Sequence, residues 1–177
     1  TDKDIEERGS WVTCSPPMRG ADARDGMRKL INSGAIRTIG SDHGPVDPIL
    51  KQRGHNNIFN SQPGMPMNET MVPLMLNLAK NGEFTIGRLA EVSSEWPAKL
   101  YGLYPKKGAI QIGSDGDFTI VDLGRKWSVQ AKNLIGKSGW TPFESMELTG
   151  NVVMTIIRGR VAARDGRPVN ELGQAIF

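Results

Sequence analysis

The segment 36–45 places reactive side chains directly after an apolar run. Its first half is rich in β-branched residues, and its second half contains Asp42 and His43 followed by a Gly-Pro pair. Strands covered on both faces are near-continuous apolar runs, and residues at the carboxyl ends of parallel strands often carry chemistry. A carboxylate there can bind a metal or act as a general base, and an imidazole can bind or polarise an anionic substrate. Asp42 and His43 are therefore the first candidates for a functional site.

Ordinary structural roles compete with each of these functions. Asp42 also fits a helix cap or turn position, and His43 fits a hydrogen-bonded turn. His55 lies in a polar stretch without a periodic partner, so we interpret it as a surface residue. Cys14 is interpreted as a small packing residue rather than a nucleophile. Gly64, in a Pro-Gly-Met-Pro turn, either offers backbone groups to a ligand or simply forms the turn. Local sequence alone leaves these alternatives open.

Composition narrows the class of protein. The hydrophobic fraction of 38% and the charged fraction of 23% are those of an ordinary soluble globular protein. A net charge of +3 with scattered basic residues leads us to expect no nucleic-acid partner. The chain has no apolar run long enough for a membrane span, so no membrane association is expected. With one cysteine no internal disulfide can form, and a cytoplasmic location is the expectation.

The first hundred residues are predicted to alternate strands and helices. We predict a strand at 11–14, a helix at 23–32 with Asp22 as its N-cap, and a strand at 35–40. Strand, helix, strand is the repeating unit of parallel α/β folds. The long polar segment 46–67 that follows is typical of a functional loop, and we expect it to border the site.

The predicted elements change from mainly helices to mainly strands at about Tyr104. Before it, apolar spacing predicts helices at 69–80 and 86–92, the second capped by Thr85, and a short helix that ends near Gly102. After it, β-branched runs predict strands at 118–121, 152–157 and 160–163, with turns that include Asp165-Gly166. The sequence thus predicts an α/β part over 1–103 and a small β domain over 104–177.

Short motifs occur in a definite order along nearly the whole chain. They are Cys14-Ser15-Pro16-Pro17-Met18-Arg19, Gly40-Ser41-Asp42-His43-Gly44-Pro45, Pro63-Gly64-Met65-Pro66, Glu69-Thr70-Met71-Val72-Pro73-Leu74, 94–103, Pro105-Lys106-Lys107-Gly108, Gly113-Ser114-Asp115-Gly116-Asp117, Thr141-Pro142-Phe143-Glu144 and 153–160. Jointly they resemble the cyclic amidohydrolases, the family of dihydroorotase, allantoinase and hydantoinase/dihydropyrimidinase.

This resemblance implies a fold and a reaction. The fold would be α/β: the last two βα units of an amidohydrolase (β/α)₈ TIM barrel, over 1–103, followed by the C-terminal part of a small β-sandwich, over 104–177. The family is a group of metal-dependent hydrolases of cyclic amides and imides. Its binuclear centre, usually zinc, activates a hydroxide that attacks a ring carbonyl, because a metal lowers the pKa of bound water and polarises the carbonyl.

The resemblance also assigns roles to particular residues. Asp42 matches the aspartate after the eighth barrel strand, which binds metal and shuttles a proton to the leaving nitrogen. His43 matches a histidine that contacts the substrate carboxylate in dihydroorotases. Ser15 matches a serine that hydantoinases offer to the substrate ring, and Gly64 matches the turn whose backbone meets the ring amide. Asp42 is thus the expected catalytic residue and metal ligand, and the other three are expected to bind substrate.

Several family features have no counterpart in the chain. The His-X-His pair of the first strand, the carboxylated lysine of the fourth and the histidines of the fifth and sixth are absent, so we expect this chain alone to be inactive. The upstream part of the same enzyme, or another chain, would complete the barrel, and a homo-oligomer is expected. Met67-Asn68 replaces the usual Gly-Leu before the glutamate, and Gly44 stands where dihydroorotases favour alanine. With Ser15, the second change favours an allantoinase- or hydantoinase-like member.

Two other classes of function remain open on this sequence. The chain could belong to a non-catalytic amidohydrolase homologue that acts as a structural or assembly partner, which missing upstream histidines would reveal. It could also be a free-standing α/β binding module, which would fold alone as a monomer.

Overall fold

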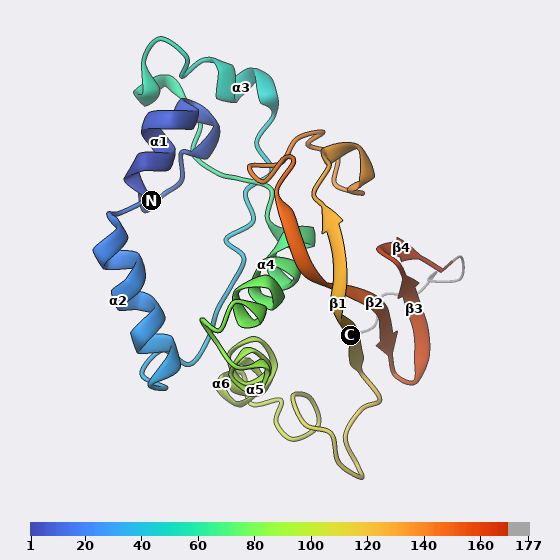
Figure 1. Ribbon diagram of the computed structural model, residues 1–177. Helices are drawn as coiled ribbons and strands as arrows, with labels where there is room; N and C mark the ends of the chain where they lie inside the picture. The colour runs from blue at the N-terminus through green and yellow to red at the C-terminus, as the bar shows by residue number, and fades with distance from the viewer. Residues whose placement is uncertain (170–177) are drawn as a thin grey trace. The chain divides into compact units, whose positions relative to one another are not determined.

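The structure is a computed structural model in which residues 1–169 are described. Helices occupy its first part and strands its second (Figure 1). The helical elements are α1 (Asp2–Arg8), the 3₁₀ turn η1 (Gly9–Val12), α2 (Ala21–Asn32), α3 (Pro48–Gln52), η2 (Ile58–Asn60), α4 (Asn68–Lys80), α5 (Ile86–Ala90), the π-helical turn η3 (Glu91–Glu95) and α6 (Trp96–Leu100). The strands are β1 (Phe118–Ser128), β2 (Glu147–Ile157), β3 (Arg160–Arg164) and β4 (Arg167–Pro168), with η4 (Ala131–Asn133) between β1 and β2.

The helix predictions hold where a local signal is clear. α4 confirms the helix predicted at 69–80, and Thr85 caps α5 by accepting a hydrogen bond from the Arg88 N–H at 3.0 Å. The helix predicted at 86–92 ends earlier, and its turns continue into η3. Asp22 is not the N-cap of α2: that position is Gly20, and Asp22 lies in the first turn. There a carboxylate still favours the helix, because it faces the positive end of the helix dipole.

The two strands predicted before residue 41 are wrong as regular strands. Residues 9–12 form η1, and 35–40 are extended without a ladder partner among the described residues. The Ile39 N–H donates to the Val92 carbonyl oxygen at 3.1 Å, but the neighbouring residues form no ladder. A strand requires a partner strand to pair its backbone groups. The apolar, β-branched composition of 35–40 therefore produces an extended conformation and no sheet.

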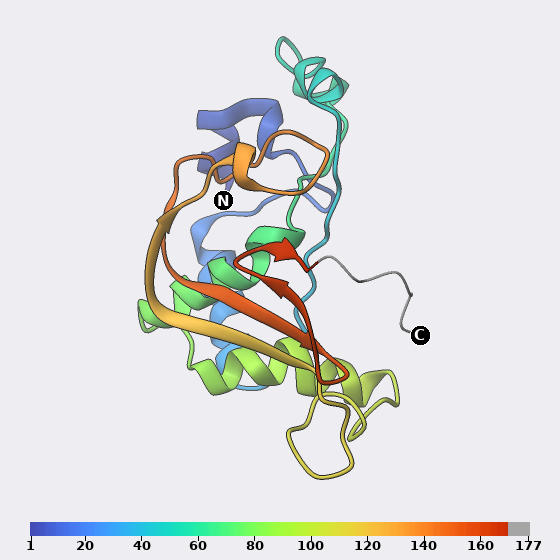
Figure 2. The same ribbon diagram turned by 90° about the vertical axis from the view of Figure 1, so that its right-hand side faces the viewer.

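The strands predicted after residue 104 are confirmed in one sheet of order β1-β2-β3-β4. β2 pairs antiparallel with β3, with Met154 opposite Arg164, Ile157 opposite Arg160, and a bulge between Thr155 and Ile156. β3 pairs antiparallel with β4 (Figure 2). The predicted Asp165-Gly166 turn joins these last two strands with φ angles of 46° and 74°. Positive φ at both central residues is the requirement of the type I′ hairpin turn, which Asp-Gly meets well.

The chain divides into two compact units that do not follow the order of the sequence. The first contains 1–36, 40–71 and 128–147, and the second contains 37–39, 72–127 and the described residues from 148 onwards. Val12, Val46 and Val129 are buried in the first unit. Leu76, Val92 and Leu148 are buried in the second. The division predicted from the sequence, into an α/β part over 1–103 and a small β domain over 104–177, stays a prediction.

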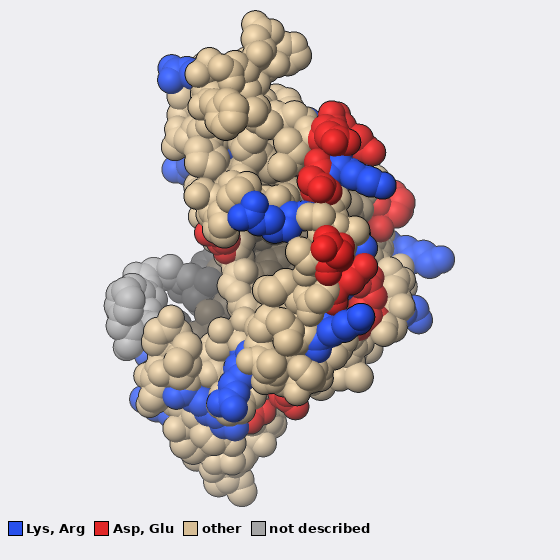
Figure 3. All heavy atoms as spheres, turned by 90° about the vertical axis from the view of Figure 1, so that its left-hand side faces the viewer, with Lys and Arg blue, Asp and Glu red and all other residues tan. Residues whose placement is uncertain are grey.

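Charges of both signs alternate on the face that carries α1 and α2 (Figure 3). Within α2, Arg24 and Arg28 both pair with Asp25. No helix among the described residues combines the length and the apolar character that a membrane crossing requires.

Candidate functional site

Three segments that are distant in sequence meet in the first compact unit. The Gly64 N–H donates to the Thr13 carbonyl oxygen at 2.9 Å, and the Gly44 N–H donates to the Met65 carbonyl oxygen at 2.9 Å. His43 and Met65 also form an isolated parallel bridge. The turn at 63–66 therefore lies between 13–15 and 42–45. Each of these three segments carries at least one of the site residues predicted from the sequence.

Two glycines allow this close approach. A Cβ atom on Gly44 would lie 3.0 Å from Gly64 Cα, and a Cβ atom on Gly64 would lie 3.0 Å from the Gly44 carbonyl oxygen. Gly64 also has a φ of 129°, a conformation that favours glycine. Asp42 is two residues from Gly44, so its Cα lies within about 12 Å of Gly64 Cα, given 3.8 Å between consecutive Cα atoms. Segment 46–67 therefore ends close to Asp42, and its role as the border of a functional site stays a prediction.

Asp42 has a strained backbone and an available carboxylate. Its φ of 47° is in the left-handed region, which costs a non-glycine residue roughly 1 kcal/mol. The side chain is exposed, and within 1–169 no hydrogen bond or ion pair engages its carboxylate. Strain of this kind persists where the surrounding structure imposes it, and it clusters at functional sites. The carboxylate is therefore presented to solvent and is available to a ligand.

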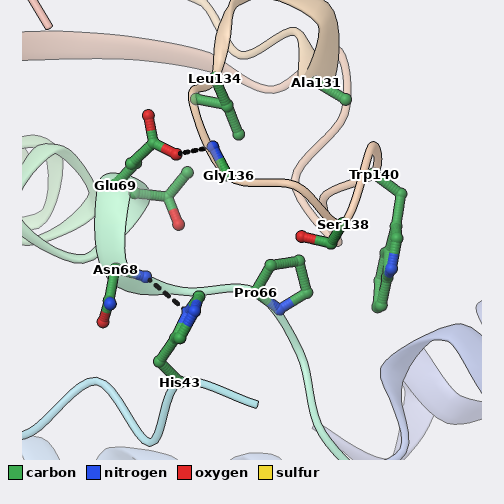
Figure 4. A pocket seen from close by; sticks show the side chains of 10 residues that line it. His43, Pro66, Asn68, Glu69, Ala131, Leu134, Gly136, Ser138 and Trp140 are labelled. Carbon is green, nitrogen blue, oxygen red and sulfur yellow. Dashed lines mark hydrogen bonds between the residues drawn. The ribbon is translucent and has the colours of Figure 1, made fainter. Parts of the chain in front are cut away.

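His43 is held by the start of helix α4. Its Nδ1 accepts hydrogen bonds from the N–H groups of Met67 at 2.9 Å and Asn68 at 3.2 Å (Figure 4). A neutral imidazole that accepts at Nδ1 carries its hydrogen on Nε2. The ring is exposed, so His43 presents Nε2–H as a donor to any acceptor that approaches. A carboxylate or a carbonyl oxygen is the partner that this arrangement suits.

Two substitutions separate the structural and ligand-binding roles of His43. His43→Asn places an acceptor near the Nδ1 position and removes Nε2, so it should keep the α4 cap, retain thermal stability and weaken substrate binding. His43→Ala removes both groups and should also lose about 1 kcal/mol of stability, which is the usual cost of a lost cap. Thermal melting and KM, measured on the complete protein, test this. Equal KM values for wild type and both variants would exclude His43 from substrate binding.

A small cavity lies beside His43 and shows a contact that sequence analysis missed. Its volume is about 20 Å³, room for a single water molecule. Glu69, at the start of α4, forms one wall and accepts hydrogen bonds from the N–H groups of Ile135 at 2.8 Å and Gly136 at 2.8 Å (Figure 4). Small-molecule sites usually need about 300 Å³ or more. This cavity is therefore too small to hold a substrate by itself.

Trp140 connects the loop after Asp42 to other residues of the first compact unit. Its indole N–H donates to the Val46 carbonyl oxygen at 2.8 Å, and its ring meets Trp11 edge-on with centroids 5.2 Å apart. The side chain of Trp140 is half-buried.

The other predicted residues have simpler surroundings. Ser15 is exposed and lies two residues after Thr13, whose carbonyl oxygen binds the Gly64 N–H. His55 is exposed, as predicted. Cys14 is half-buried, and its thiol donates to the Pro16 carbonyl oxygen at 3.3 Å.

A metal ion would find one suitable donor among these residues. Within 1–169 no three His, Cys, Asp or Glu side chains are grouped to hold a metal ion. Zinc sites in proteins take three or four protein ligands. The exposed, unpaired carboxylate of Asp42 fits the role of one such ligand, but the set is too small to complete a site.

Comparisons with known proteins show the family of this chain. The sequence matches the profile described as "Amidohydrolase family" over residues 4–162. It is 38% identical to an L-hydantoinase of Paenarthrobacter aurescens, over 100% of this chain and 39% of that protein. It is 34% identical to a dihydroorotase of Methanothermobacter thermautotrophicus, over 95% of this chain and 37% of that protein.

Solved structures show the same relationship. An L-hydantoinase (dihydropyrimidinase) from Arthrobacter aurescens matches with a TM-score of 0.90 and 37% identity, over 96% of this chain and 38% of that one. A D-hydantoinase (dihydropyrimidinase) from Thermus sp. matches with a TM-score of 0.81 and 31% identity. The chain thus spans about two fifths of the length of these relatives and has their fold over that part.

Proposed function

Because this chain belongs to the amidohydrolase family, we propose that the complete protein hydrolyses a ring amide or imide, in the manner of a hydantoinase, allantoinase or dihydroorotase. The observation that carries this proposal is the meeting of 13–15, 42–45 and 63–66 in one compact unit. These segments hold Ser15, Asp42, His43 and Gly64, in the order of the family motifs. Identities of 38% to an L-hydantoinase and 34% to a dihydroorotase support the substrate class.

Each of these residues has a group free for its proposed role. The Asp42 carboxylate would take the proton of the attacking water and pass it to the leaving nitrogen. The Nε2–H of His43 would donate to an oxygen of the substrate. The N–H of Gly64 is already bonded to Thr13, so its carbonyl oxygen is the group that would accept a ring N–H. The hydroxyl of Ser15 would bind a polar atom of the ring.

We further propose that Asp42 is one ligand of a binuclear zinc centre. A bound metal would polarise the ring carbonyl and lower the pKa of a water molecule. The remaining ligands would come from an upstream part of the same protein or from another chain.

The extended segment 35–40 supports the proposal of a completed barrel. It has the composition of a strand but forms no β-ladder within the described residues, and a strand needs a partner strand. On the preceding helix α2, Met27 is 53% exposed and Leu30 is 46% exposed. Further barrel strands and helices would cover both features. We also propose that the complete protein assembles as a homo-oligomer and acts in the cytoplasm.

The activity is tested by assaying the complete, zinc-loaded protein against hydantoin, dihydrouracil, allantoin and dihydroorotate. We expect ring opening of at least one of these, measured as the appearance of the open-chain product. Activity should fall after treatment with a chelator and return with zinc. A folded, metal-loaded protein that opens none of these rings would contradict the proposal.

A further inference from the structure

Lys51 is the largest fully buried side chain among the described residues, with 0% of its surface exposed. It lies in α3, within the loop that follows Asp42. Its ammonium group donates to the carbonyl oxygen and to the hydroxyl of Thr13, both at 3.0 Å. It also lies 5.7 Å from the centre of the Trp140 ring. A buried charge is expensive unless it is well bonded, so this placement calls for an explanation.

No carboxylate within 1–169 forms an ion pair with Lys51. Neutral oxygens and an aromatic ring bond to its ammonium group instead, and burial lowers the pKa of the amine below its ordinary value, against a smaller opposing effect of Cys14. A lysine that only anchored a surface loop would keep its head group in water. The position of Lys51 therefore points to a specific acceptor, and that acceptor is Thr13.

Thr13 connects Lys51 to the substrate wall. Its carbonyl oxygen accepts from both Lys51 and the Gly64 N–H. Its hydroxyl accepts from Lys51 and donates to the Ser10 carbonyl oxygen at 2.9 Å, and it lies 3.0 Å from the Ser61 hydroxyl. A single residue thus bonds to both ends of the loop after Asp42, two positions before Ser15.

The loop packs closely against the 3₁₀ turn η1 at the same place. A Cβ atom on Gly54 would lie 2.6 Å from Ser10 Cβ and 2.5 Å from Ser61 Cβ. Gly54 thus allows the loop to lie against η1 close to the bonds made by Lys51 and Thr13.

We propose that Lys51 is a positioning residue that, through its bonds to both the carbonyl and the hydroxyl group of Thr13, sets the separation between Ser15 and the Gly64 turn. This inference rests on the proposed function, which has Ser15 and Gly64 bind the substrate ring. Lys51 does not touch the ring itself. Its loss should therefore loosen the binding wall and leave the reacting groups at Asp42 unchanged.

The test compares three variants of the complete, zinc-loaded protein. Lys51→Met keeps the length and apolar bulk of the side chain and removes its donors. Thr13→Val keeps the carbonyl oxygen and removes only the hydroxyl, so it is the milder variant. Lys132→Met removes an exposed lysine of the same compact unit and serves as the control.

For Lys51→Met we expect KM to rise about tenfold with kcat within about twofold of wild type, since a small misplacement of binding groups has effects of this size. Thr13→Val should raise KM about threefold by the same mechanism, and Lys132→Met should change neither constant. Hydrogen exchange in peptides that contain Gly64 should accelerate in the first two variants, because the Gly64 N–H bond to Thr13 opens more often. A solely structural role would reduce the amount of folded enzyme and leave KM unchanged.

Unchanged KM and unchanged Gly64 exchange in folded Lys51→Met would overturn the proposal. If that variant does not fold, the same result for Thr13→Val would overturn it. An effect on kcat alone would also do so, since it would place Lys51 at the reacting atoms. Failure of the proposed function has a different signature: wild-type protein would open no ring, while Gly64 exchange would still report whether Lys51 holds the turn.

Discussion

Replacing Asp42 with asparagine is expected to lower kcat of the complete protein by about a thousandfold or more. Asparagine has the same shape and tolerates the left-handed backbone of this position, where φ is 47°. It lacks the negative charge that binds a metal and accepts a proton. The fold should therefore persist while turnover is lost. Steady-state kinetics, thermal melting and metal analysis of wild type and Asp42→Asn measure the three effects.

Asp47→Asn is the matched control for this experiment. Asp47 is an exposed aspartate of the same loop, and it caps α3 by accepting from the Ile49 N–H at 2.8 Å. Asparagine is an equally good N-cap, so this variant should retain both stability and turnover. Turnover near the wild-type value in Asp42→Asn would remove Asp42 from the mechanism.

Gly64→Ala is expected to reduce kcat/KM at least tenfold and to destabilise the protein by about 1–3 kcal/mol. The new Cβ atom would lie 3.0 Å from the Gly44 carbonyl oxygen and 3.0 Å from Val46 Cγ2. The backbone φ at position 64 is 129°, which residues with a side chain rarely adopt. The turn would have to move away from Gly44 and so from Asp42. Denaturant unfolding and kinetics on the complete protein are the measurements.

Gly34→Ala is the control that separates the effect of backbone strain from the effect of losing the close Gly44–Gly64 contact. Gly34 also has a positive φ, 85°, but a Cβ atom there meets nothing within 4 Å. This variant should lose about 1 kcal/mol of stability and keep kcat/KM unchanged. Similar losses of kcat/KM in Gly34→Ala and Gly64→Ala would show that the Gly44–Gly64 contact has no special role at the site.

Features that depend on neighbouring residues were predictable from the sequence. The cap at Thr85 needs only the hydroxyl and a backbone N–H three residues later. The turn at Asp165-Gly166 needs only two residues that accept positive φ. The apolar spacing of α4 repeats within one helix. Such signals lie within a few positions of the chain, so they survive whatever surrounds them.

The order of the motifs determined the family and the order of the candidate site residues before any coordinates. Local context alone left Asp42 undecided between a turn residue and a ligand. The order of the motifs that contain Ser15, Asp42 and Gly64 predicted the amidohydrolase family. The family match over residues 4–162 confirms that prediction. The roles of these residues stay predictions until the variants are measured.

Only the tertiary structure decided which segments pair and what is buried. Segment 35–40 has the composition of a strand, yet it is one only when another strand pairs with it. The Glu69 carboxylate binds backbone groups 66 and 67 positions away, and Lys51 donates to Thr13 from 38 positions away. A lysine in a polar loop is usually exposed, so nothing in the sequence predicted its burial. Hydrogen-bonded ladders and desolvated charges depend on partners far along the chain, and the folded structure alone brings those partners together.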